Sequence, residues 1–206
     1  MPELLSPAGI FTTASRPCLR FVVRKILLVT GATTLTAGLL FGSLRAFGAN
    51  SVWFAFLVVW LPMTWLGTVS RLVQPRLPAR YHALRAFERG GHLYELLGIR
   101  LVKRALRRGP LAVFNPDLHL PTEPTPAAVA HLDQRMRDAE ASHFILLVAT
   151  AGVAVHAVIR GWWAAAGWTL LFDVLVNGYP VMLQRYNRAL LSRRFAPAHP
   201  VTGTDR

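Results

Sequence analysis

Residues 140–188 read EASHFILLVATAGVAVHAVIRGWWAAAGWTLLFDVLVNGYPVMLQRYNR, two apolar runs joined by a short turn and bounded by polar residues at both ends. The first run, 144–159, contains His156 as its only ionisable side chain. The second run, 162–183, is long enough to cross a hydrocarbon core of about 30 Å at about 1.5 Å per residue. These residues predict a transmembrane helical hairpin whose two polar ends lie at the same depth.

Polar residues recur along one face of the second run. At about 100° per residue they lie within about 60° of one direction, and they are Asp173, Asn177, Pro180, Gln184, Asn187 and Arg188. Polar groups are costly in hydrocarbon unless they face protein or water, so this face should point inward, towards the first helix or a cavity. On that helix Glu140 and His143 are three positions apart, which places both beside the 184–188 end of the polar face.

The whole chain has the composition of a membrane protein. Of its 206 residues, 53% are hydrophobic and 16% charged, and the mean hydropathy is +0.36, which excludes an ordinary soluble domain. The net charge of +13 would suggest nucleic acid in a soluble protein, but the basic residues flank apolar runs, so we expect no nucleic-acid partner. Cys18 is the single cysteine, and no cysteine or histidine cluster has metal-ligand spacing, so no metal site is expected.

The pattern predicts an all-α polytopic membrane protein, a single membrane domain over 1–206. Four transmembrane helices are expected near 26–44, 52–69, 143–159 and 162–183, with little fixed structure in 1–19 and a disordered tail over 195–206. The first apolar run could be a signal peptide, but it is longer than a usual signal core and another span follows, which favours an uncleaved helix.

The basic residues predict the orientation of the spans. Lys and Arg number four before the first span, twelve in 70–142 and five after 183, against one in each of the other two links. Both termini and the segment 70–142 are therefore expected on the cytoplasmic side of the cell membrane.

The polar residues of the hairpin also carry a family resemblance. The spacing Glu140-x-x-His143, followed by Asn177-x-x-Pro180-x-x-x-Gln184-Arg185-Tyr186-Asn187-Arg188, resembles the glycosyl-4,4'-diaponeurosporenoate acyltransferase family. The likeness covers roughly 85–194 and extends upstream to Phe87-Glu88, Tyr94-Glu95, Arg100 and Lys103. That family consists of membrane enzymes of staphyloxanthin-type carotenoid pathways, which esterify the sugar of a glycosylated carotenoid acid with a fatty acyl chain. The resemblance implies a lipid-soluble acceptor, surrounding membrane lipids and no cofactor, with an acyl thioester such as acyl-CoA as a possible co-substrate.

This resemblance suggests a catalytic arrangement. Glu140 would accept a hydrogen bond from the ring of His143, fix its tautomer and raise the basicity of the other nitrogen, so that His143 deprotonates a sugar hydroxyl. Asn187, Gln184 or Arg188 would stabilise the oxyanion. Substrate-binding roles are expected for Asn177, Arg185, Tyr186, Arg100, Lys103, Tyr94 and Glu88. Asn177 has a second interpretation, in which it satisfies backbone groups freed by Pro180.

The segment 70–142 is expected to be helical on both sides of a proline-rich loop. Residues 81–89 and 92–108 each read as a helix, separated by two glycines. The second helix is basic and amphipathic, which suits an anionic membrane surface. A second interpretation, compatible with the first, is that its basic face holds the phosphates of a soluble acyl donor. After the loop, Thr125 is a good N-cap and Pro126 a good first residue for one long helix that continues into the third span.

A non-catalytic protein is the alternative from another class. Four membrane helices with a basic cytoplasmic segment could bind anionic lipid or a partner through charge alone. The sequence assigns no role to Asp173 or His156 and no oligomeric state.

Overall fold

The computed structural model describes residues 16–70, 72, 75–108 and 125–195. The predicted disordered tail, apart from Phe195, and almost all of the predicted proline-rich loop lie outside these residues. Phe195 is the last residue of a helix, so the expectation of disorder is wrong for this residue. Within the described residues all regular structure is helical, which confirms the all-α fold, and the elements are α1 (Arg16–Phe47), α2 (Val52–Val69), α3 (Ala79–His82), α4 (Ala86–Arg89), α5 (His92–Leu96), α6 (Ile99–Arg108), α7 (Pro126–Ile159), α8 (Trp163–Asp173), the π-helix η2 (Val174–Gly178) and α9 (Tyr179–Phe195).

Four of the described helices are long and apolar enough to cross a membrane, which confirms a polytopic membrane protein. They cover 20–47, 52–69, 126–159 and 163–195; the exact limits of the spans within them stay a prediction. The helix α1 begins at Arg16, so the expectation of little fixed structure is wrong for 16–19. Pro17 is compatible with this start, because the first turn of a helix needs no partner for its backbone N–H groups.

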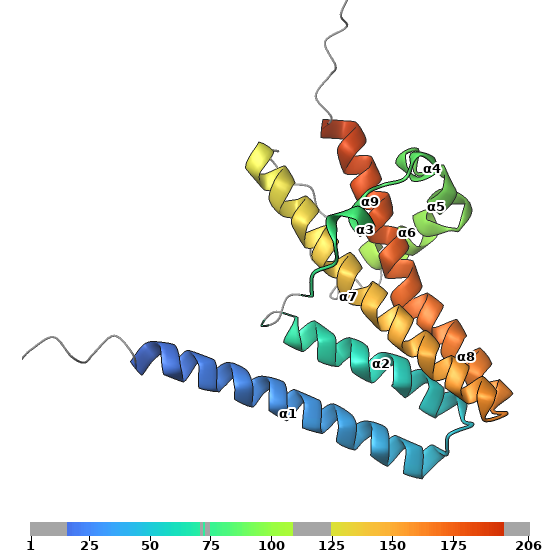
Figure 1. Ribbon diagram of the computed structural model, residues 1–206. Coiled ribbons are helices and arrows are strands. Elements are labelled where there is room, and N and C mark those ends of the chain that lie inside the picture. Colours follow the sequence, from blue (N-terminus) through green and yellow to red (C-terminus); the bar gives the residue numbers. More distant parts are fainter. Residues whose placement is uncertain (1–15, 71, 73–74, 109–124, 196–206) are drawn as a thin grey trace, which may run out of the picture.

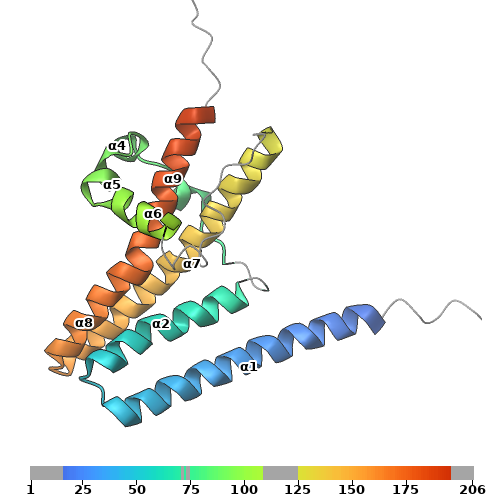
Figure 2. The ribbon, with the colours of Figure 1, turned by 180° about the vertical axis from the view of Figure 1, so that it is seen from behind.

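The membrane helices are arranged as a hairpin with two further helices at its side. Figure 1 shows α7 running beside α8 and α9, with α2 packed against α8 and α7. The helix α1 packs mainly on α2 and exposes large apolar side chains such as Phe21, Leu27 and Phe41, which suit contact with lipid. Seen from behind, α1 lies beside α2 and apart from α7 and α9 (Figure 2).

The closed end of the hairpin is a tight turn between α7 and α8. Gly161 has a φ of 74°, a left-handed conformation that favours glycine. Three small residues, Ala157, Ala165 and Ala166, are buried beside the turn, and they let the two helices approach closely. The predicted transmembrane hairpin is therefore present.

The helix α7 begins as the sequence predicted. Thr125 Oγ1 accepts a hydrogen bond from the Ala128 N–H at 3.2 Å, and Pro126 occupies the first helical position. Its 34 residues span about 51 Å, which exceeds the thickness of a hydrocarbon core. The first part of α7 therefore projects beyond the apolar run, at the open end of the hairpin where α9 ends (Figure 1).

The segment between α2 and α7 is more broken than predicted. Residues 81–89 form two short helices, α3 and α4, and 92–108 form α5 and α6. Gly98 has a φ of 78° and ends α5. The helix α3 ends at His82. There the guanidinium groups of Arg185 and Arg188, on α9, donate hydrogen bonds to the backbone oxygens of Tyr81 and His82. This capping comes from distant residues, so local sequence patterns could not predict it.

The π-helix interrupts the second arm of the hairpin. Residues 174–178 widen the helix immediately before Pro180, and the Tyr179 N–H bonds to the Val174 oxygen. Proline cannot donate to the preceding turn and its ring clashes there, which accounts for a local change of helix type at this point. The widened turn contains Asn177, whose side chain is fully buried.

Candidate functional site

Glu140 is the centre of a buried charge network between α7, α9 and α3. It has no exposed surface, and its carboxylate accepts hydrogen bonds from Arg185 Nη1 at 2.6 Å and Arg188 Nη1 at 2.8 Å. The Nδ1 atom of His82 lies 3.3 Å from the same carboxylate. The expected proximity of Glu140 to the 184–188 end of the second arm is therefore confirmed.

Arg185 links this network to α4 and α5. Its Nε and Nη2 atoms each lie 2.8 Å from a carboxylate oxygen of Glu88, a forked pairing that fixes both groups. The hydroxyl of Tyr94 donates to the same carboxylate at 2.6 Å, and Arg185 Nη1 also donates to the Tyr81 backbone oxygen at 3.1 Å. Three residues that were predicted to bind substrate therefore bind one another: Glu88, Tyr94 and Arg185.

Arg188 completes the network on the side of Asp133. Its Nε donates to Asp133 at 3.0 Å, its Nη1 to Glu140 and its Nη2 to the His82 backbone oxygen at 2.6 Å. Asp133 also pairs with Arg137 at 2.6 Å. Because each of its three nitrogens donates to an acceptor, Arg188 holds α9 to α7 and to the end of α3; its oxyanion role stays a prediction.

The charge state of this network is set by its hydrogen bonds. Burial alone would raise the pKa of Glu88, but the hydrogen bonds from Arg185, Tyr94 and the Arg85 N–H lower it to about 2. Burial and the negative charge of Glu140 raise the pKa of Tyr81 to about 12. At neutral pH Glu88 is therefore a carboxylate and Tyr81 a neutral phenol.

His143 has a different partner from the one predicted. Its Nδ1 lies 3.2 Å from Asn177 Oδ1, and Asn177 Nδ2 donates to Asp173 Oδ1 at 2.7 Å. The predicted hydrogen bond between Glu140 and His143 is wrong, because guanidinium groups already occupy the Glu140 carboxylate and bind it more strongly than a neutral ring would. The backbone interpretation of Asn177 is also wrong, since its side chain binds two other side chains.

The pairing fixes the tautomer of His143. Asn177 presents its amide oxygen to the ring, so Nδ1 carries the proton and Nε2 is the basic nitrogen. Every buried side-chain nitrogen or oxygen in the described part of the chain has a hydrogen-bond partner, whereas no described group bonds to Nε2 of His143. The Nε2 atom therefore has some exposed surface and no hydrogen-bond partner among the described residues.

The other predicted site residues lie around this core. Asn187 accepts a hydrogen bond from Lys103 Nζ at 2.8 Å, and Glu95 accepts from Arg100 at 2.7 Å and Tyr186 at 2.9 Å. Gln184 is half-buried and has no side-chain hydrogen bond to another described residue. The side-chain amides of Gln184 and Asn187 make no N–H hydrogen bond to another described residue, and Arg188 has two N–H groups beyond the three that donate.

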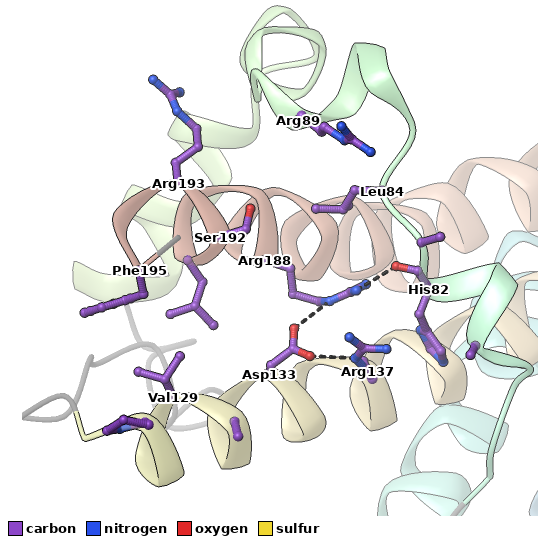
Figure 3. A pocket seen from close by; sticks show the side chains of 15 residues that line it. His82, Leu84, Arg89, Val129, Asp133, Arg137, Arg188, Ser192, Arg193 and Phe195 are labelled. Atoms are coloured by element: carbon purple, nitrogen blue, oxygen red, sulfur yellow. Dashed lines mark hydrogen bonds and ion pairs between the residues drawn. The ribbon is translucent and has the colours of Figure 1, made fainter. Parts of the chain in front are cut away.

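A large open pocket lies on the outer side of the charge network. It has a volume of about 1050 Å³ and lies among α3, α4, the first turns of α7 and the last turns of α9. Figure 3 shows its two ends: Phe195 and Val129 at one, His82 and Arg137 at the other. It is lined by Ala79, His82, Ala83, Leu84, Arg89, Pro126, Val129, Ala130, Asp133, Arg137, Arg188, Leu191, Ser192, Arg193 and Phe195.

Sequence reasoning missed two residues of the site and assigned no role to a third, Asp173. His82 and Asp133 contact the two arginines of α9 from distant positions in the chain, and Asp173 anchors Asn177. A signal for acidic partners was present, because Arg185 and Arg188 stand three positions apart on one helix face and a membrane helix cannot keep two such charges unpaired. For His82 no such signal exists.

These features together define the class of protein. A polytopic membrane fold carries, at one end of its hairpin, an oriented histidine with a free basic nitrogen, a rigid charge network and a pocket large enough for a substrate. This is the organisation of an integral membrane enzyme.

The comparison with known families identifies the kind of enzyme. Residues 78–196 match the model of the glycosyl-4,4'-diaponeurosporenoate acyltransferase family. Because the match covers more than half of the chain, the protein belongs to this family, whose general activity is acyl transfer to a glycosylated carotenoid. No curated protein and no solved structure matches the chain.

Proposed function

We propose that the protein transfers a fatty acyl group from an acyl thioester to a sugar hydroxyl of a glycosylated carotenoid or related glycolipid. It acts in the cell membrane, with both termini and the segment 70–142 in the cytoplasm. The excess of Lys and Arg in these parts of the chain supports the orientation. The site then lies at the cytoplasmic end of the hairpin, where a lipid-soluble acceptor and a soluble donor can both arrive.

His143 is the general base of this proposal. The observation that carries it is the hydrogen-bonded series from Asp173 through Asn177 to His143, with distances of 2.7 and 3.2 Å. This series holds the ring in one orientation and leaves Nε2 without a partner in the described structure. A base needs this combination of a fixed tautomer and a reachable lone pair.

The reaction follows from that geometry in two steps. Nε2 of His143 takes the proton of the sugar hydroxyl while the oxygen attacks the thioester carbonyl carbon. The carbon–sulfur bond then breaks, the thiolate leaves, and the imidazolium returns the proton to it, which yields the ester and a free thiol. The free N–H groups of Gln184 and Asn187 are the candidate donors to the oxyanion formed between the two steps.

The helices α4, α5 and α6 have a supporting role in this proposal. Phe87, Leu96 and Leu101 expose 60%, 86% and 69% of their surfaces, although they belong to helices outside the hairpin. Such side chains fit the headgroup region of a membrane. Anchoring of this kind would hold Glu88 and Tyr94 in place around Arg185.

The test compares histidine variants in membranes that contain equal amounts of each protein. His143→Gln should lower conversion of a glycosylated carotenoid to its acyl ester by about 10²–10⁴-fold, the range for a lost general base. His156→Gln is the matched control, because His156 lies on the same helix, near the closed end of the hairpin, where its ring lies edge-on to the Trp162 ring. Near-normal conversion by His143→Gln, together with loss of conversion by His82→Gln, would move the base to His82 and refute this assignment.

A further inference from the structure

The pocket at the open end of the hairpin has a charge pattern of its own. Four arginines line it, Arg89, Arg137, Arg188 and Arg193, against one acidic residue, Asp133. Asp133 is already shared between Arg137 and Arg188. The pocket therefore has positive charge that the described residues do not neutralise.

The excess charge lies on the two exposed arginines. Arg89 makes no ion pair with a described residue, and Arg193 makes one hydrogen bond, from Nη1 to the Gly90 backbone oxygen at 3.2 Å. Both side chains stand on the α4 and α9 side of the pocket (Figure 3). Two arginines with free N–H groups at the edge of a cavity are suited to bind phosphate oxygens.

The end of the pocket farthest from Glu140 is apolar. Val129, Leu191 and Phe195 line it, and Figure 3 shows Val129 and Phe195 there on facing elements. An aromatic ring and two aliphatic side chains can hold a flat heterocycle. Together with the two arginines, which line the same pocket on the α4 side of α9, this surface favours a phosphorylated carrier that also has a nucleobase.

The opposite end of the pocket points along α7 towards the proposed base. His82 and Arg137 lie at this end, with Asp133 beside Arg137. Asp133 and His143 are ten positions apart on α7, about 15 Å along the helix. A ligand whose phosphates bind at Arg89 and Arg193 would therefore need a long flexible arm to present its reactive group to His143.

We propose that this pocket binds the nucleotide and phosphates of an acyl thioester donor of the coenzyme A type, with the phosphates on Arg89 and Arg193 and the base against Phe195. This inference rests on the proposed acyl transfer and adds the donor site to it. It also places the donor away from Arg100 and Lys103, whose side chains bind Glu95 and Asn187.

Binding without turnover tests the proposal. The protein is placed in phosphatidylcholine nanodiscs, and the affinity is measured for a thioether analogue of palmitoyl-coenzyme A, which cannot transfer its chain. Arg89→Gln/Arg193→Gln should bind the analogue about tenfold more weakly, the effect of two lost contacts between exposed charges. Arg104→Gln is the matched control, an exposed arginine of α6 that does not line the pocket, and it should bind as the wild type does.

Several results would overturn the donor site. One is wild-type affinity for the analogue in the double variant; another is equal weakening in Arg104→Gln. A third is a lipid outcome, in which phosphatidylglycerol added to the nanodiscs displaces the analogue from the wild type but no longer affects the double variant, because the arginines then hold a lipid headgroup. The variants are expected to remain monodisperse, since both arginines are exposed.

The same assay separates this inference from the proposed chemistry. His143→Gln should bind the analogue with wild-type affinity even though it transfers no acyl group. If His143 is not the base, His143→Gln keeps near-normal transfer, whereas failure of the donor site appears as wild-type binding of the analogue by Arg89→Gln/Arg193→Gln.

Discussion

Glu140→Gln is the substitution on which the sequence and the structure differ most. The sequence suggested that Glu140 orients the catalytic histidine, so its loss would reduce activity and leave the protein folded. In the structure Glu140 is fully buried and accepts hydrogen bonds from Arg185 and Arg188. We therefore expect Glu140→Gln to reduce stability first, and to change the transfer rate of the folded fraction little.

The magnitude follows from the contacts that are lost. Each hydrogen bond to a charged group contributes about 1.5–3 kcal/mol, and Glu140 makes one with each arginine. Arg185 keeps Glu88 and Arg188 keeps Asp133, so neither charge is left wholly unpaired. The expected loss is about 3–5 kcal/mol, which corresponds to a Tm about 6–20 °C lower for a chain of this size.

The assay is thermal unfolding of the purified protein in detergent, followed by the fluorescence of its six tryptophans. Asp133→Asn is the matched control, because Asp133 also pairs with Arg188 but its side chain is 28% exposed; its Tm should fall by less than half as much. This reasoning would be refuted if the Tm of Glu140→Gln stayed within about 2 °C of the wild type while the variant transferred no acyl group. Glu140 would then have a direct role in the reaction.

Two further predictions concern α4 and the turn that follows it. The pKa of Glu88 is lowered to about 2 in the folded protein, so its contribution to stability is complete above the unfolded pKa of about 4.3 and is lost as the pH falls towards 2. Acid titration of the wild type should therefore show a loss of Tm in this window that is smaller in Glu88→Gln; identical titrations would contradict the prediction. Gly91→Ala should lower stability by about 1–2 kcal/mol, because Gly91 has a φ of 74° and an added Cβ would lie 3.1 Å from the Tyr186 ring. Gly152→Ala, where an added Cβ meets nothing within 4 Å, is the control, and equal Tm values for the two variants would exclude strain at Gly91.

The parts of the fold that could be predicted depend on local or periodic signals. The hairpin, the inward polar face and the start of α7 at Thr125 all follow from hydropathy, helical phase and capping chemistry. Asp173, Asn177 and Arg188 are buried as expected. Each of these features needs only residues that are close in sequence, or two helices forced together by a short turn.

The partner of His143 could not be predicted in this way. A spacing of three positions allows Glu140 and His143 to meet but does not require it, and the choice was made by Arg185 and Arg188 on another helix. His82 reaches the same carboxylate from 58 residues away, through a segment whose path depends on tertiary contacts. The family resemblance located the right residues, while their pairing became visible only in three dimensions.

The π-helix has a consequence for how insertions and deletions would act on this protein. A π turn contains one residue more than the α turn it replaces, but it closes from residue i to residue i+5, so each of its residues rotates the helix by less than the 100° of an α-helix. The extra residue is therefore absorbed within 174–178, and the residues that follow keep nearly the phase of an uninterrupted helix. Removing one residue from 174–178 would restore a regular helix and leave Arg185 and Arg188 facing Glu140, but it would change the turn that presents Asn177 to His143. A one-residue deletion at this point is therefore expected to affect the orientation of His143 more than the charge network at the open end of the hairpin.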